Sequence, residues 1–149
     1  KGYDYSICKL NKNNTKKNLL YFNFNIHTNP TIRTKVKQIL LSNGFLMNNK
    51  KKWSDYIKEL SEHYFCVSPE GNGVDCHRIW ECIYVNCIPI VKNNPILKKT
   101  FFDVPILWVD DYSIITTKYL QNQLQYFNNK NIDKSTLKYW KKKIHTLLL

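Results

Sequence analysis

The stretch from Tyr64 to Lys92 restricts the possible folds more than any other part of the chain. Tyr64–Val67 is apolar and aromatic, which predicts a short buried strand, and residues 68–73 after it are typical of a turn. From Asp75, a good N-cap residue, apolar side chains recur at helical spacing, and Ile88–Val91 is a short run rich in β-branched residues. We therefore expect a strand, a glycine-containing loop, a helix and a second strand in this order.

A glycine loop between a strand and the N-terminus of a helix is suited to binding phosphate. Gly71 and Gly73 would let the backbone approach a phosphate group, and the helix dipole would favour its negative charge. The same two glycines could also serve only a tight turn. Ser68 could likewise donate a hydrogen bond to a phosphate oxygen or only close the turn.

The segment PEGNGVDCHRIWECIYVNCIPIV resembles the donor-binding half of exostosin-like glycosyltransferases, whose pattern is close to P-x-G-x-G, then R-x-W-E, then G-C-I-P-V. The residues that match this pattern are Pro69, Gly71, Gly73, Arg78, Trp80, Glu81, Cys87, Ile88 and Pro89. The chain departs from the pattern at Asn86, where glycine is usual, and at Cys82, where alanine is common. Asn86 can end the helix in place of glycine. The resemblance covers about the middle third of the chain and indicates the superfamily without naming the sugar.

The resemblance implies that this region holds a nucleotide-sugar donor without a metal or another cofactor. Arg78 would bind the diphosphate with its guanidinium fork, and Glu81 would accept hydrogen bonds from the ribose hydroxyls. Glu70 would contact the donor sugar and is the one candidate for a catalytic role. The residues expected to bind the donor are Ser68, Gly71, Asn72, Gly73, Asp75, His77, Arg78 and Glu81.

Each of these side chains also has a simpler interpretation. Arg78 could lie on a solvated face, and Glu81 could form a salt bridge with a lysine. Asp75 could act only as the helix cap, and His77 could only cover the loop. The candidates for contact with the nucleotide base, among which the sequence does not choose, are His27, Thr28, Lys92 and Asn93.

Outside this stretch the sequence predicts further strands that alternate with helices. The expected strands are Leu19–Phe24, Phe45–Met47 and Pro105–Val109, with a short one at Tyr5–Cys8. The expected helices are Thr31–Ser42, Trp53–Glu62, 95–99, 117–127 and a last one that begins at Asp133 or Ser135 and runs to Leu149.

This alternation predicts an α/β fold, a single Rossmann-like three-layer domain with a mostly parallel sheet of about five strands. Residues 1–18 would be a linker or a partial element, and residues 19–149 would form the nucleotide-sugar-binding domain. Ligands of such sheets bind outside the carboxyl ends of the strands. We therefore expect the loops after Phe24, Val67, Val91 and Val109 to meet at the site.

The chain of 149 residues carries a formal net charge of +12, which suits an anionic ligand or partner. Arg33, Lys35, Lys37 and Lys50–Lys52 are expected on a solvated surface, from which they could also steer an anionic donor. A basic nucleic-acid-binding module is an alternative function, although the lysines are scattered and the aromatic residues follow core periodicity. A non-catalytic relative of the transferase fold is another alternative.

The five cysteines show no Cys-x-x-Cys repeat and predict reduced thiols rather than a disulfide scaffold. A zinc site formed by Cys76, His77, Cys82 and Cys87 would lack the usual paired spacing of ligands. The thiols favour a cytoplasmic location, and no apolar run is long enough to predict a transmembrane segment. Because the chain begins at Lys1 without a methionine, a lost N-terminal anchor and the secretory lumen also stay open.

Together these features favour a glycosyltransferase domain that binds the donor, with a glycan or a protein as the acceptor. The resemblance implies that the domain is one half of a two-domain enzyme, in which a preceding second Rossmann-like domain supplies the acceptor site and the general base. It also favours a uridine donor, whereas the similar fucosyltransferase type uses a guanine nucleotide. We expect these residues alone to bind a nucleotide-sugar with little or no sugar transfer.

Overall fold

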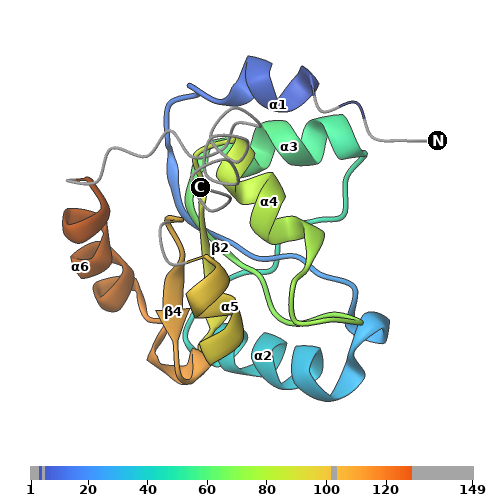
Figure 1. Ribbon diagram of the computed structural model, residues 1–149, viewed down its shortest axis with the longest axis vertical. Coiled ribbons are helices and arrows are strands. Elements are labelled where there is room, and N and C mark those ends of the chain that lie inside the picture. The colour runs from blue at the N-terminus through green and yellow to red at the C-terminus, as the bar shows by residue number, and fades with distance from the viewer. Residues whose placement is uncertain (1–3, 5, 102–103, 129–149) are drawn as a thin grey trace, which may run out of the picture.

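Four parallel strands form the sheet in the computed structural model, which describes residues 4, 6–101 and 104–128 (Figure 1). The strands are β1 (Asn18–Tyr21), β2 (His63–Val67), β3 (Ile88–Lys92) and β4 (Leu107–Val109). They lie side by side in the order of the sequence, and Phe65 of β2 pairs with Leu20 of β1 and with Ile88 of β3. All carboxyl ends of the strands therefore lie along one edge of the sheet.

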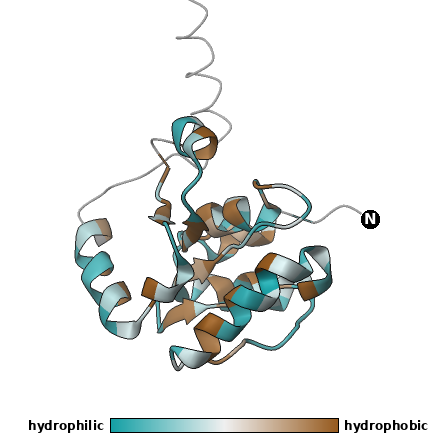
Figure 2. Ribbon diagram, turned by 90° about the horizontal axis from the view of Figure 1, so that it is seen from below, coloured by the Kyte–Doolittle hydropathy of each residue, from teal (hydrophilic) through white to brown (hydrophobic). Residues whose placement is uncertain are grey.

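Helices cover both faces of this sheet. The helices on one face are α2 (Pro30–Ser42) and α6 (Thr117–Asn128), and those on the other are α1 (Ser6–Asn11), α3 (Trp53–Ser61), α4 (His77–Tyr84) and α5 (Pro95–Thr100). Phe65 and Ile90 face the first layer, whereas Cys66 and Val91 face the second. A parallel sheet that is buried on both faces needs near-continuous apolar strands. Figure 2 shows this pattern, with apolar residues gathered in the strands and a mostly hydrophilic α6.

The predicted α/β architecture with a parallel sheet between helices is confirmed, with four strands in the described residues instead of about five. The predicted strand Phe45–Met47 does not form. Asn48 bonds this segment to the chain after β1, because its backbone N–H donates to the Phe22 carbonyl at 2.9 Å and its Oδ1 accepts from the Phe22 N–H at 3.0 Å. The backbone and the side chain of one residue thus make two hydrogen bonds where a fifth strand would make a ladder.

The predicted strand Tyr5–Cys8 is also wrong, because Ser6–Asn11 is the helix α1. The Asp4 carboxylate accepts a hydrogen bond from the Ser6 N–H at 3.0 Å, and Cys8 is buried against the α3–α4 layer. The predicted helix 133–149 lies outside the described residues. No helix in the described part of the chain combines the length and apolar character needed to cross a membrane.

The helix α4 begins later than predicted and ends as predicted. Its N-cap residue is Cys76, so Asp75 is exposed one position before the cap and does not fill that role. At the other end Asn86 has φ 57°, the left-handed conformation that usually requires glycine, and the Cys87 N–H donates to the Cys82 carbonyl at 2.9 Å. This bonding is typical of a helix end, and asparagine can take the place of glycine here because it tolerates the left-handed conformation.

A single ammonium group ties the segment before β1 to two helix ends. Lys16 Nζ donates to the Ser61 carbonyl at 2.8 Å and to the Val85 carbonyl at 3.1 Å, where α3 and α4 end. The last carbonyls of a helix lack partners within it and carry partial negative charge. Although burial lowers the pKa of Lys16, its ammonium stabilises both ends at once.

Replacing Lys16 by methionine would leave these two carbonyls without their partner. We expect the free energy of unfolding to fall by about 1–3 kcal/mol, because buried polar groups that lose a hydrogen bond keep their desolvation cost. Lys17→Met is the matched control, since Lys17 forms an exposed ion pair with Glu62 at 3.0 Å that should contribute only about 0–1 kcal/mol. Urea denaturation measures both changes, and equal losses would contradict the role assigned to Lys16.

A buried histidine makes the stability depend on pH. His63 Nδ1 lies 2.7 Å from the Glu59 carbonyl, and the His63 ring packs edge-on against Tyr21 at 5.2 Å between centroids. Burial lowers the pKa of His63 below its ordinary value of 6.5, so the unfolded chain takes up a proton before the folded chain does. The stability that neutral His63 contributes is therefore present above pH 6.5 and is lost as the pH falls through the folded-state pKa.

We expect the free energy of unfolding to decrease between about pH 7.5 and about pH 5.5, and to decrease less in a His63→Asn variant. The asparagine keeps a donor for the Glu59 carbonyl but does not titrate. Urea denaturation at a series of pH values checks this difference. An identical pH dependence in the two proteins would show that His63 is not its source.

Candidate functional site

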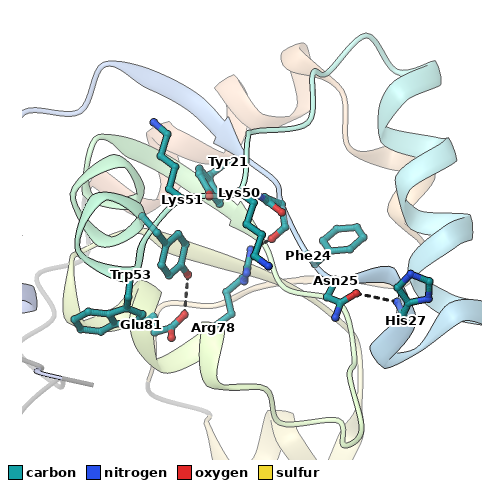
Figure 3. Close-up of a pocket in the computed structure, with 11 residues that line it drawn as sticks. Tyr21, Phe24, Asn25, His27, Lys50, Lys51, Trp53, Arg78 and Glu81 are labelled. Carbon is teal, nitrogen blue, oxygen red and sulfur yellow. Dashed lines mark hydrogen bonds between the residues drawn. The ribbon is translucent and has the colours of Figure 1, made fainter. Parts of the chain in front are cut away.

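A cleft of about 770 Å³ opens beside the carboxyl end of β1 (Figure 3). Its walls come from the chain after β1, the segment before α3, and the helices α3 and α4. The residues that line it are Tyr21, Asn23, Phe24, Asn25, His27, Lys50, Lys51, Trp53, Tyr56, Arg78 and Glu81. In Figure 3 Glu81 and Trp53 lie at one end, Lys50 and Arg78 in the middle, and Asn25 and His27 at the other end.

Arg78 lies in the first turn of α4 and is held on two sides. Its Nη1 donates a hydrogen bond to the Asn23 carbonyl, and its Cζ lies 5.3 Å from the centroid of the Tyr56 ring. Burial disfavours the charged guanidinium, but the acidic groups around it, Glu81 among them, outweigh this effect and raise the pKa of Arg78. The cleft therefore contains a permanent positive charge whose position is fixed.

Glu81 lies three residues after Arg78, so both side chains leave the same face of α4. Its side chain is buried, and its Oε2 accepts a hydrogen bond from the Tyr56 hydroxyl at 2.7 Å. Burial raises the pKa of Tyr56 far above its ordinary range, so this hydroxyl keeps its proton and donates. The alternative interpretation of Glu81, a salt bridge with a lysine, is not seen within the described part of the chain.

Two lysines line the cleft from the segment after Asn48, which is hydrogen-bonded to Phe22 at the end of β1. Lys51 Nζ lies 3.1 Å from Glu59 Oε1 and forms an ion pair, whereas Lys50 projects into the middle of the cleft (Figure 3). The lining thus contains the cations of Lys50, Lys51 and Arg78 and the single carboxylate of Glu81. Such an excess of positive charge favours an anionic ligand.

Arg33 overturns a prediction, because it is buried with 9% exposure instead of lying on a solvated face. Its guanidinium donates to the carbonyls of Asn25 and Glu70 at 2.9 Å each and to the Pro69 carbonyl at 3.2 Å. Its Cζ also lies 5.7 Å from the centroid of the Phe24 ring. One side chain of α2 therefore joins the segment after β1 to the glycine loop after β2, a role that the polar pattern of α2 does not reveal.

The two glycines of this loop have different surroundings. A Cβ atom on Gly71 would lie 2.9 Å from Arg33 Nη2 and 3.3 Å from Thr28 Cγ2, whereas a Cβ atom on Gly73 would meet nothing within 4 Å. The Gly71 N–H donates to the Gly73 carbonyl at 3.1 Å, and the Gly71 carbonyl accepts from Asn29 Nδ2 at 3.2 Å. The close approach of Arg33 is therefore a structural reason for glycine at position 71.

Of the residues predicted to bind the donor, Arg78 and Glu81 line the cleft. Ser68 is buried, with its N–H bonded to the Ile90 carbonyl at 2.9 Å and its hydroxyl 3.5 Å from the Cys66 carbonyl. The other predicted residues are on the loop or the start of α4, outside the cleft lining; they are Glu70, Gly71, Asn72, Gly73, Asp75 and His77. Of the candidates for base contact, His27 lines the cleft and Thr28, Lys92 and Asn93 do not.

The sequence gives little signal for the rest of the lining. Trp53 and Tyr56 follow the helical periodicity of core residues, and Lys50 and Lys51 belong to a short basic run that is typical of a solvated turn. The one available hint is that this run directly precedes an aromatic helix start. Only the fold brings these residues next to α4.

No protein-family model matches the chain, and no curated protein matches it at a significant level. The structure also bears on disulfides and metal sites. All five cysteines are free thiols. Within residues 4, 6–101 and 104–128, no three His, Cys, Asp or Glu side chains gather where they could hold a metal ion.

The two glycines provide a matched test of the Arg33 contact. Gly71→Ala should lower the free energy of unfolding by about 1–3 kcal/mol, because the added methyl group would push Arg33 from its carbonyl partners. Gly73→Ala should change it by no more than about 1 kcal/mol, since the site is open and the substitution restricts the unfolded chain. Urea denaturation measures the free energy of unfolding of both variants and of the wild type. A loss at position 73 as large as that at position 71 would contradict this explanation.

Proposed function

We propose that this chain is the donor-binding half of an exostosin-like glycosyltransferase that uses a nucleotide-diphosphate sugar, with a uridine donor favoured. The observation that supports this proposal is the presence of Arg78 and Glu81 in one cleft beside the carboxyl end of β1. Ligands of open parallel sheets bind at this edge. The excess of cationic side chains in the cleft fits the charge of a diphosphate.

In this proposal Arg78 binds the diphosphate and offsets the negative charge that grows on it as the sugar leaves. Asn23 and Tyr56 fix the guanidinium before the donor arrives, so little reorganisation is needed during the reaction. Glu81 accepts hydrogen bonds from the ribose hydroxyls, and Tyr56 occupies only one of the several acceptor positions of its carboxylate. The aromatic ring of Trp53 supplies a flat apolar surface for the base.

The contribution of this domain is therefore positioning and charge stabilisation rather than proton transfer. The acceptor, a glycan or a protein, and the general base belong with a preceding second Rossmann-like domain. Glu70 stays a candidate contact to the donor sugar, although its carboxylate is not part of the cleft lining. We expect the 149 residues alone to bind the donor with little or no transfer of sugar.

A nucleic-acid-binding module is the second candidate, because the same cleft combines Lys50, Lys51 and Arg78 with the aromatic rings of Trp53 and Tyr56. The buried carboxylate of Glu81 in the same wall disfavours a nucleic-acid backbone. Salt-sensitive affinity for single-stranded oligonucleotides, unchanged by Arg78→Lys, would favour this candidate over the glycosyltransferase.

The Glu81→Gln variant tests the ribose contact. Glutamine keeps the size of the side chain and an oxygen that can accept from the Tyr56 hydroxyl, but it removes the charge and one acceptor oxygen. We expect the wild-type chain to bind UDP about tenfold more tightly than 2′-deoxy-UDP, and the variant to lose most of this preference. Two-dimensional NMR titration measures both dissociation constants and shows that each protein is folded.

The matched control is Asp55→Asn, which removes an exposed carboxylate of α3 that does not line the cleft. It should leave the preference for UDP over 2′-deoxy-UDP unchanged. A preference that survives Glu81→Gln would contradict the role of Glu81. Tighter binding of GDP than of UDP would favour the fucosyltransferase type, and a folded chain that binds neither nucleotide would overturn the proposed function.

A further inference from the structure

Lys50 lines the cleft from an irregular segment, and its side chain is exposed. The hydrogen bonds between Asn48 and Phe22, at 2.9 and 3.0 Å, fix the chain two residues before Lys50 to the end of β1. Asn48 Nδ2 also lies 3.5 Å from Glu59 Oε1 of α3. In Figure 3 the Lys50 side chain points into the opening that Arg78 enters from α4. The fold therefore brings these two cations to the middle of one cleft.

The three cations of the cleft differ in how their charge is balanced. Lys51 is paired with Glu59 at 3.1 Å. Within residues 4, 6–101 and 104–128, neither Lys50 nor Arg78 forms an ion pair with a carboxylate, and the hydrogen bond of Arg78 goes to an uncharged backbone carbonyl. A bound anion would therefore supply the ion pair that neither Lys50 nor Arg78 makes within these residues.

We propose that Lys50 and Arg78 together form a diphosphate subsite, in which Arg78 holds one phosphate and Lys50 selects for the second. This inference rests on the proposed function and assigns a specificity-determining role to Lys50, which the sequence predicted on a solvated surface from which it could also steer an anionic donor. Arg78 is a fixed fork suited to bidentate contact, while Lys50 is a point charge on a flexible stem that can follow the second phosphate.

The arrangement also gives the donor a direction in the cleft. Glu81 and Trp53 at one end would hold the nucleoside, and Lys50 and Arg78 in the middle would hold the diphosphate (Figure 3). The sugar would then lie toward Asn25 and His27 at the other end. There the His27 N–H is bonded to Asn25 Oδ1 at 3.1 Å, which fixes the turn that faces the sugar.

The test is an NMR titration of the full chain with UMP and UDP, each compared between the wild type and two variants. Lys50→Met removes the proposed contact to the second phosphate. Lys52→Met is the matched control, because Lys52 is an exposed lysine of the same segment that does not line the cleft, so the loss of net charge is equal. We expect the wild type to bind UDP about tenfold more tightly than UMP, which a charge-assisted contact can supply.

In Lys50→Met the ratio of the affinity for UDP to that for UMP should fall to about twofold, while the affinity for UMP is retained. In Lys52→Met this ratio should stay near tenfold. An unchanged ratio in Lys50→Met, or an equal loss of affinity for UMP and UDP, would overturn the role of Lys50 while leaving the proposed function intact. If the wild type binds guanine nucleotides instead, the ratio of its affinities for GDP and GMP tests the role of Lys50 in the same way. A wild-type chain that binds none of these nucleotides would overturn the proposed function, and this inference with it.

Discussion

The segment that leaves β1 is held by two arginine side chains, and the shape of the cleft depends on both. Arg33 reaches the Asn25 carbonyl from α2, and Arg78 reaches the Asn23 carbonyl from α4. Because α2 and α4 lie on opposite faces of the sheet, this short segment is fixed from two directions. Arg33 also binds the carbonyls of the loop after β2, so a single guanidinium sets the relative positions of the two loops at this edge. The two loops at this edge are thus joined through one side chain.

The hydrogen bonds of these two arginines go to backbone carbonyls, which carry no net charge. Backbone carbonyls accept from a guanidinium, but a buried or partly buried cation is best stabilised when an anion lies near it. The glycine loop is turned toward Arg33, and the Gly71 N–H is already bonded to the Gly73 carbonyl. We therefore propose that the phosphate groups of the donor lie in the cleft between α3 and α4 rather than on the loop that the sequence pattern favours.

Short-range sequence patterns predicted the secondary structure of residues 64–92 well. They did not predict which residues would come together to line the cleft. The strands at Tyr64–Val67 and Ile88–Val91, and the left-handed Asn86 after α4, follow from short-range patterns of apolar and turn-forming residues. The length of the Arg33 side chain allowed it to cross from a polar helix position to carbonyls of two other loops, which no periodicity reveals. Lys50 is likewise distant in sequence from α4, so only the packing of the layers shows that it shares a cleft with Arg78 and Glu81.

The most direct test of this account is to map where UDP binds on the isotopically labelled chain by NMR. If the donor lies in the cleft, the indole N–H of Trp53 and the amides of Lys50 and Lys51 should shift on titration, and those of the exposed loop 72–75 should hardly move. Shifts confined to that loop, with the Trp53 signal unchanged, would contradict the account. They would place the phosphate on the glycine loop and leave the cleft of Arg78 and Glu81 without its proposed ligand.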